Sequence, residues 1–154
     1  MKNYQQRSLD SKKKDRKLNA PSVTDYMTTN LITFSPDAEI KDVIESLLSN
    51  RITGAPVLNK NREVVGMIDD KDCLSLLVGG AYYNHPVGRD KVSDYMSNVM
   101  KSISINDDIV DVANIFTSSK YKRLLVMDED GKLAGQISRR DILRAIHDMN
   151  ANTW

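Results

Sequence analysis

The sequence predicts a mixed α/β (α+β) fold built from two β-α-β-β-α repeats, related by a pseudo-two-fold axis and packed into one module. Residues 23–78 align with residues 92–147 at an offset of 69 without a gap, and 14 of the 56 aligned pairs are identical. A repeat of this length is one supersecondary unit, and so short a unit buries too little surface to be stable alone. We therefore expect the two copies to pack together, with paired ligand clefts between them.

Each copy begins with a helical lead-in and a short strand. The lead-ins are residues 23–27 and 92–96, and the strands are residues 31–34 and 100–103. Ser35 is expected to cap the next helix, because Ser-Pro-Asp is typical of a helix start. That helix carries an apolar stripe at the helical period in both copies, formed by Ile40, Val43, Ile44, Leu47 and Leu48 and by Ile109, Val112, Ala113 and Phe116.

A hairpin and a second helix complete each copy. Aliphatic runs flank polar turns at residues 59–62 and 128–131, which is the pattern of a β-hairpin. The closing helices are expected at residues 71–78 and 139–147. Copy one thus covers residues 21–79, and copy two covers residues 91–148.

Composition and charge favour a cytoplasmic globular protein. The chain is 40% hydrophobic and 28% charged, with a mean hydropathy of −0.44, and it contains neither a signal-like stretch nor an apolar run long enough to span a membrane. We therefore predict no membrane partner. Its single cysteine, Cys73, excludes an intrachain disulfide and a cysteine-based metal cluster. Cys73 lies in an apolar helical frame, so we expect a buried structural thiol.

The N-terminus differs from the rest of the chain. Residues 1–20 carry seven basic and two acidic residues, for a net charge of +5, whereas the remainder carries −4. We expect a disordered basic arm, and the alternative is an arm that contacts nucleic acid or an acidic partner. Residues 80–90 are expected to form a surface linker, and residues 149–154 a C-terminal tail.

The end of each hairpin carries the motif with the most chemistry. Copy two reads Ser138-Arg139-Arg140-Asp141, and copy one reads Asp69-Asp70-Lys71-Asp72. One interpretation is structural, with Ser138 as helix cap and Asp141 in the first turn. The other is functional. A helix N-terminus and arginine side chains attract phosphate, and a carboxylate at the same place suits a ribose diol.

These features together resemble a tandem pair of CBS domains, also called a Bateman module, as found in stand-alone CBS domain-containing proteins. The resemblance rests on the residue 23–27 lead-in, Thr33-Phe34-Ser35-Pro36, residues 51–57 and the Gly135-x-Ile-Ser-x-x-Asp ending. It implies a regulatory module that binds an adenosine derivative, such as AMP, ADP, ATP or S-adenosylmethionine, between its repeats. It also implies a homodimer and an effector protein as partners.

The resemblance assigns one well-formed ligand site. Asp141 would bind ribose with help from Ser138, and basic side chains would bind phosphate. The base would lie near the early strand of copy one. The residues so assigned are Thr28, Leu31, Thr33, Ile52, Thr53, Gly54, Ala55, Lys122, Arg123, Ile137, Ser138, Arg139, Arg140 and Asp141.

The pseudo-symmetric site is expected to be weaker. It would use Asp72, Met96, Met100 and Tyr121, with Lys122. Asp69 and Asp70 place negative charge where phosphate should bind. We therefore predict one preferred nucleotide site.

Other functions are less well supported. Ser138 has no histidine partner that would make it a nucleophile, no phosphate-binding loop is present, and the two histidines lack metal-like spacing. We predict no enzymatic activity, no metal and no cofactor other than the regulatory nucleotide. The alternatives are a ligand-independent adaptor or oligomerisation module and, less favoured, a nucleic-acid-binding protein that uses the basic arm.

Overall fold

The computed structural model describes residues 20–78, 90–98 and 100–153 and divides the chain into two compact units. Of these residues, unit 1 comprises 20–29, 102–129 and 134–153, and unit 2 comprises 30–78, 90–98, 100–101 and 130–133. The expected basic arm and surface linker lie outside the described residues, except for Ala20 and Asp90.

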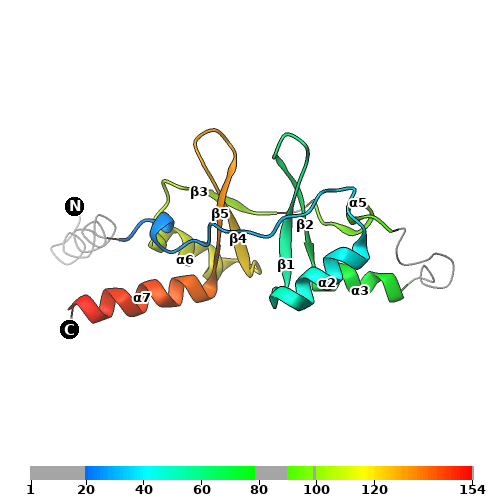
Figure 1. Ribbon diagram of the computed structural model, residues 1–154. Helices are drawn as coiled ribbons and strands as arrows, with labels where there is room; N and C mark the ends of the chain where they lie inside the picture. The colour runs from blue at the N-terminus through cyan, green and yellow to red at the C-terminus, as the bar shows by residue number, and fades with distance from the viewer. Residues whose placement is uncertain (1–19, 79–89, 99, 154) are drawn as a thin grey trace, which may run out of the picture. The chain divides into compact units, whose positions relative to one another are not determined.

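Unit 2 contains a helix, a hairpin and a second helix in the predicted order (Figure 1). Helix α2 (Ile40–Asn50) precedes strands β1 (Gly54–Leu58) and β2 (Val64–Asp69), which pair in antiparallel register from Gly54↔Asp69 to Leu58↔Val64. Helix α3 (Asp70–Leu74) and the 3-10 turn η2 (Ser75–Leu77) follow directly. The buried stripe Ile40, Val43 and Leu47 of α2 packs with Val57 and Ile68.

Unit 1 repeats this order with an added edge strand (Figure 1). Strand β3 (Ser102–Ser104) pairs in parallel with β4 (Arg123–Met127), and β4 neighbours β5 (Leu133–Ser138). Helix α6 (Ile109–Ser118) lies between β3 and β4 in sequence, and α7 (Arg139–Thr153) follows β5. An apolar core joins the two helices to the sheet, with members that include Val112, Phe116, Leu124, Ile137 and Ile142.

The two lead-ins are exchanged between the repeats. The lead-in of copy one contains η1 (Val23–Asp25), and its Val23 is fully buried in the core of unit 1. The lead-in of copy two contains α5 (Val92–Tyr95), and its Val92 is fully buried in the core of unit 2. Apart from residues 130–133, which cluster with unit 2, each compact unit therefore combines the body of one sequence repeat with the lead-in of the other.

Matching backbone hydrogen bonds hold the exchanged segments in place. Thr28 and Gln136 exchange N–H···O bonds of 2.8 and 3.0 Å in unit 1, and Met67 and Ser97 exchange bonds of 2.9 and 2.8 Å in unit 2. Since β2 and β5 would otherwise present unpaired backbone groups at these positions, the exchanged segments supply partners for them.

Two local predictions for copy one are wrong. Ser35 does not cap α2, because the helix begins at Ile40 after an intervening turn in which the Ser35 hydroxyl accepts from the Asp37 N–H. Residues 31–34 do not form a strand of their own. Phe34 alone makes a parallel bridge to Val57, with its N–H donating to Pro56 O at 3.1 Å.

Candidate functional site

The start of α7 has the capping geometry that the sequence predicts. The Ser138 N–H donates to Asp141 Oδ2 at 2.8 Å, and the Ser138 hydroxyl lies 3.0 Å from the same oxygen. The Asp141 N–H in turn reaches Ser138 Oγ at 3.4 Å. These reciprocal bonds satisfy two of the donors that a helix start leaves open and fix the Asp141 carboxylate at the end of β5.

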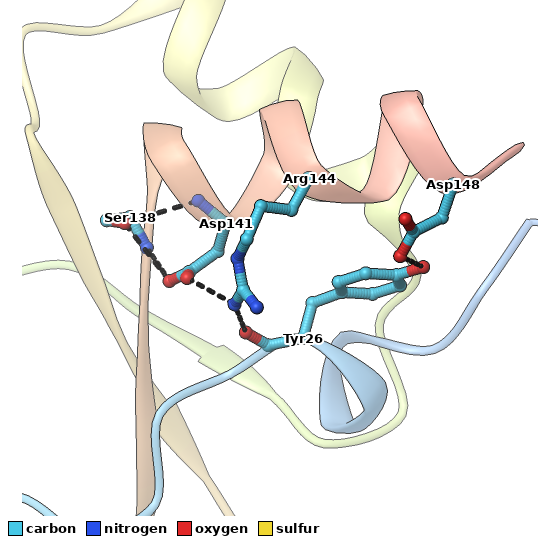
Figure 2. Close-up of polar contacts among 5 residues, drawn as sticks. All are labelled: Tyr26, Ser138, Asp141, Arg144 and Asp148. Carbon is cyan, nitrogen blue, oxygen red and sulfur yellow. Dashed lines mark hydrogen bonds and ion pairs between the residues drawn. The ribbon is translucent and has the colours of Figure 1, made fainter. Parts of the chain in front are cut away.

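Asp141 is a charged residue that is nonetheless buried, with 8% of its surface exposed. A buried carboxylate needs donors or a counter-charge. Arg144, one turn further along α7, supplies both through an Nη2–Oδ1 contact of 2.8 Å (Figure 2). Oδ2 is thus held by Ser138 and Oδ1 by Arg144.

The same arginine binds the lead-in of copy one. Arg144 Nη2 donates to the Tyr26 carbonyl oxygen at 3.2 Å, and the guanidinium lies 6.0 Å from the centre of the Tyr26 ring. The Tyr26 hydroxyl donates to Asp148 Oδ2 at 2.8 Å (Figure 2), and this bond raises the pKa of the Tyr26 hydroxyl. Two turns of α7 therefore hold the exchanged lead-in against the helix.

Several predicted phosphate-binding side chains lie near this helix start. Arg139 donates from Nη2 to the Tyr121 carbonyl oxygen at 3.1 Å, which brings the segment before β4 to the start of α7. Lys122 and Arg123 follow Tyr121 directly, and Arg140 is exposed on the first turn. The predicted Thr28 pairs with Gln136 on β5, and Ile137 is fully buried in the core.

The predicted base-binding residues belong to unit 2. Gly54 pairs with Asp69, and the Asp70 N–H donates to the Thr53 carbonyl oxygen at 2.8 Å, so residues 53–55 lie beside the start of α3. Ala55 is buried, Ile52 is half-buried and packs against the core, and Thr33 is exposed near the half-buried Leu31. Asp141 and these residues therefore come from different compact units.

The start of α3 has the same backbone geometry and a different charge balance. Asp69 and Asp72 form a capping box, with Asp69 N–H to Asp72 Oδ2 at 3.0 Å and Asp72 N–H to Asp69 Oδ1 at 2.8 Å. Ser75 occupies the place that Arg144 has in copy two. Burial, followed by the charges of Asp69 and Asp70, raises the pKa of the Asp72 carboxyl.

Two other members of the predicted weaker site pack against apolar cores, Met96 in unit 2 and Tyr121 in unit 1. The Met96 side chain lies against Gly66 of β2, where an added Cβ would be 2.8 Å from Met96 Sδ. Met100 belongs to unit 2 and Tyr121 to unit 1. Cys73 is buried as predicted, and burial together with Asp72, Asp69 and Asp70 raises the pKa of its thiol to about 11.

Sequence reasoning missed Arg144, Tyr26 and Asp148. A signal for Arg144 was present, because an arginine three residues after a helical aspartate lies on the same face. Tyr26 and Asp148 are 122 positions apart, so their contact depends on the lead-in exchange. Among the described residues, no group of three or more His, Cys, Asp or Glu side chains could hold a metal ion, and no helix is long and apolar enough to cross a membrane.

Comparison with known proteins identifies this arrangement. Residues 23–79 and 92–148 each match the CBS domain family. The chain belongs to that family. The crystal structure of the CBS-pair protein CBSX2 from Arabidopsis thaliana is 27% identical, covers 86% of this chain and 99% of the other, and superposes with a TM-score of 0.75. The predicted fold of two CBS repeats is therefore confirmed.

Further relatives include a ligand complex. The crystal structure of CBSX2 in complex with AMP is 30% identical, covers 84% of this chain and 98% of the other, and has a TM-score of 0.73. By sequence, CBSX1 of Arabidopsis thaliana, a chloroplastic CBS domain-containing protein, is 28% identical over 149 residues. Inosine-5′-monophosphate dehydrogenase of Aquifex aeolicus is 24% identical over 118 residues.

The chain spans less than two thirds of the length of the two curated sequence relatives named above. The matches span 80% of this chain and 63% of CBSX1, and 77% of this chain and 23% of the dehydrogenase.

Proposed function

We propose that this CBS pair is a regulatory module that binds an adenosine nucleotide of the AMP, ADP or ATP type, with Asp141 as the ribose ligand. The observation that carries the proposal is the buried, fully positioned carboxylate at the start of α7, in a chain that is 30% identical to CBSX2, whose crystal structure contains AMP. S-adenosylmethionine shares the ribose and the base, and it is the alternative ligand.

The chemistry of Asp141 supports a ribose ligand. An ionised carboxylate offers about four lone-pair positions. Ser138 takes two positions on Oδ2 and Arg144 takes one on Oδ1, so Oδ1 retains one acceptor position. A ribose hydroxyl can donate to that position, and a hydrogen bond to a charged acceptor is stronger than a neutral one.

Phosphate binding is proposed for the basic residues around the same helix start. Arg139 and Arg140 occupy the first turn of α7. Lys122 directly precedes the neighbouring strand β4, and Arg123 begins it. Arginine forks match phosphate oxygens, and the positive end of the α7 dipole favours an anion. The base is proposed to lie against the copy-one residues that the family resemblance assigns: Leu31, Thr33, Ile52, Thr53, Gly54 and Ala55.

The proposed output is a shift in population between conformations that an effector protein distinguishes. A ligand can shift such an equilibrium only by its differential affinity for the two states. The match to inosine-5′-monophosphate dehydrogenase spans 23% of that enzyme, and the proposal assigns no catalysis to this chain.

A homodimer is proposed as the assembly. Unit 2 exposes Leu48, Leu74 and Leu77 at 75, 64 and 67% around a groove of about 510 Å³ between α2 and α3, and unit 1 exposes Leu143 and Ile146 on α7. A second copy that covers these apolar side chains would remove them from water. Light scattering should give twice the chain mass, and Leu74→Glu should give the monomer. A wild-type monomer would contradict this assembly.

Thermal unfolding with added ligand tests the proposed function. AMP, ADP, ATP, S-adenosylmethionine and NAD are compared on the wild type and on Asp141→Ala. A ligand at 100 times its Kd stabilises by about 2.7 kcal/mol, which is several degrees for a chain of this size. We expect a shift with at least one adenosine nucleotide, and its loss in the variant. No shift at millimolar ligand would favour the ligand-independent adaptor. Salt-sensitive binding of RNA that requires residues 1–20 would favour the nucleic-acid hypothesis.

A further inference from the structure

We propose that Arg144 is the positioning residue of the nucleotide site, and that it couples ribose binding at Asp141 to docking of the exchanged lead-in. This inference rests on the proposed function. It concerns a residue that does not contact the nucleotide in the proposal and acts through the carboxylate that does.

The Arg144 guanidinium connects Asp141 to the lead-in of copy one. A single nitrogen, Nη2, donates to Asp141 Oδ1 at 2.8 Å and to the Tyr26 carbonyl oxygen at 3.2 Å. Nη2 carries two hydrogens, so it can serve both acceptors at once. The Asp141 side chain is 12% exposed and the Arg144 side chain 57% exposed, so the pair places the carboxylate inside and leaves most of the cation at the surface.

Arg144 also fixes the orientation of the Asp141 carboxylate. Ser138 holds Oδ2, and without Arg144 the other oxygen would have no donor among the described residues. The carboxylate could then rotate about its last torsion, which has a broad minimum. With Arg144 in place, the acceptor position that remains on Oδ1 has a fixed direction, as a bound ribose hydroxyl requires.

Copy one has no counterpart of Arg144, which supports a role specific to copy two. Asp72 has the same capping-box geometry, but position 75 is serine, and the charges beside Asp72 are those of Asp69 and Asp70. The acid alone is therefore common to both repeats, whereas the arginine is present only in copy two. This difference selects Asp141 as the ribose ligand.

The same arginine couples ligand binding at Asp141 to docking of the copy-one lead-in. Because one nitrogen joins Asp141 to the backbone of Tyr26, a ligand that stabilises this arrangement of Asp141 also stabilises the docked lead-in. Binding and docking then promote each other by the same factor. The pairing of Thr28 with Gln136 lies immediately after Tyr26, so its amide reports docking.

Calorimetric titration with AMP and with 2′,3′-dideoxy-AMP tests the role of Arg144. The proteins are the wild type, Arg144→Gln, Arg144→Lys and, as a control on the same helix, Asp148→Asn. The wild type should bind AMP at least about tenfold more tightly than the dideoxy compound. Arg144→Gln should reduce that ratio below about threefold, whereas Arg144→Lys and Asp148→Asn should keep most of it. A merely structural role would weaken both ligands equally.

The outcomes separate the two proposals. A wild type that binds neither compound overturns AMP as the ligand and this inference with it. A wild type that binds both equally overturns the ribose role of Asp141 and this inference, while nucleotide binding itself stands. A wild type that prefers AMP, with an unchanged ratio in Arg144→Gln, overturns only the role of Arg144. Hydrogen exchange measures the coupling: AMP should slow exchange at the Thr28 amide in the wild type and leave it unchanged in Arg144→Gln. Equal slowing in both proteins would contradict the coupling.

Discussion

The two helix starts that follow β2 and β5 share a backbone geometry and differ in charge. In each, a capping residue and an aspartate three positions later exchange hydrogen bonds. Asp141 has Arg144 at 2.8 Å, whereas Asp72 has Asp69 and Asp70 as its charged neighbours and Ser75 in place of the arginine. An aspartate at a repeated position therefore does not have a repeated chemistry, because the residues around it decide whether its charge is balanced.

The two helix starts differ in charge, whereas the two lead-ins make matching backbone contacts in both units. If the units differ only at the helix starts, equivalent substitutions at the lead-in contacts should cost the same in each. An added Cβ at Gly135 would lie 2.8 Å from Thr28 O, and at Gly66 it would lie 2.9 Å from Ser97 O. Because these oxygens belong to paired backbone, Gly135→Ala and Gly66→Ala should each lower the free energy of unfolding by about 1–3 kcal/mol.

Urea unfolding measures both costs. Asn114→Ala, on the exposed face of α6, is the control and should change stability by less than about 0.5 kcal/mol. A large loss for one glycine and none for the other would show that the lead-ins are not equivalent.

The repeated elements could be predicted from the sequence because their signals are local. The helical stripes, the hairpins and the Ser138–Asp141 cap each depend on residues a few positions apart. Tyr26 and Val92 could not be placed in the same way. Each lead-in precedes its own repeat in the chain, and the two lead-ins have nearly the same sequence, so the pattern does not tell which core each valine enters. The exchange is thus decided by long-range packing that the repeat pattern leaves open.

Local competition explains the error at the start of α2. The Ser35 hydroxyl accepts from the Asp37 N–H within a turn instead of capping the helix. Serine commonly makes such short-range bonds outside helices. The helix then begins at Ile40, beside the copy-two lead-in, where the Ile40 N–H donates to Asp90 O at 2.9 Å. A backbone partner from the residue just before copy two therefore takes part in setting this boundary.

Replacing each aspartate by asparagine sharpens the charge comparison. Asp141→Asn removes the ion pair with Arg144 and should destabilise by about 1–2 kcal/mol at pH 7. Asp72→Asn keeps an oxygen that can accept from the Asp69 N–H and removes a charge beside two others. It should stabilise by less than about 1 kcal/mol at pH 7. Changes of opposite sign in the free energy of unfolding of the two variants would support the difference in charge balance, and changes of equal sign would contradict it.

The pH dependence of Asp72→Asn follows from linkage. The pKa of Asp72 is raised in the folded protein above its ordinary 3.8. Protonated Asp72 is therefore favoured by folding, and its contribution to stability is fully present below pH 3.8 and is lost as the pH rises through the folded pKa. The gain in the free energy of unfolding that Asp72→Asn gives over the wild type should vanish below pH 3.8 and grow toward neutral pH. Unfolding midpoints measured across this range check it, and an advantage that is constant with pH would contradict the shift.

The two aspartates differ in their charged neighbours, and only Asp141 is proposed to bind the ribose. The most direct test is the AMP affinity of Asp141→Ala beside that of Asp72→Ala, measured by calorimetry with both proteins confirmed as folded. We expect Asp141→Ala to weaken AMP binding by at least about tenfold and Asp72→Ala to leave the affinity within about twofold of the wild type. Equal losses in the two variants, or a loss confined to Asp72→Ala, would contradict it.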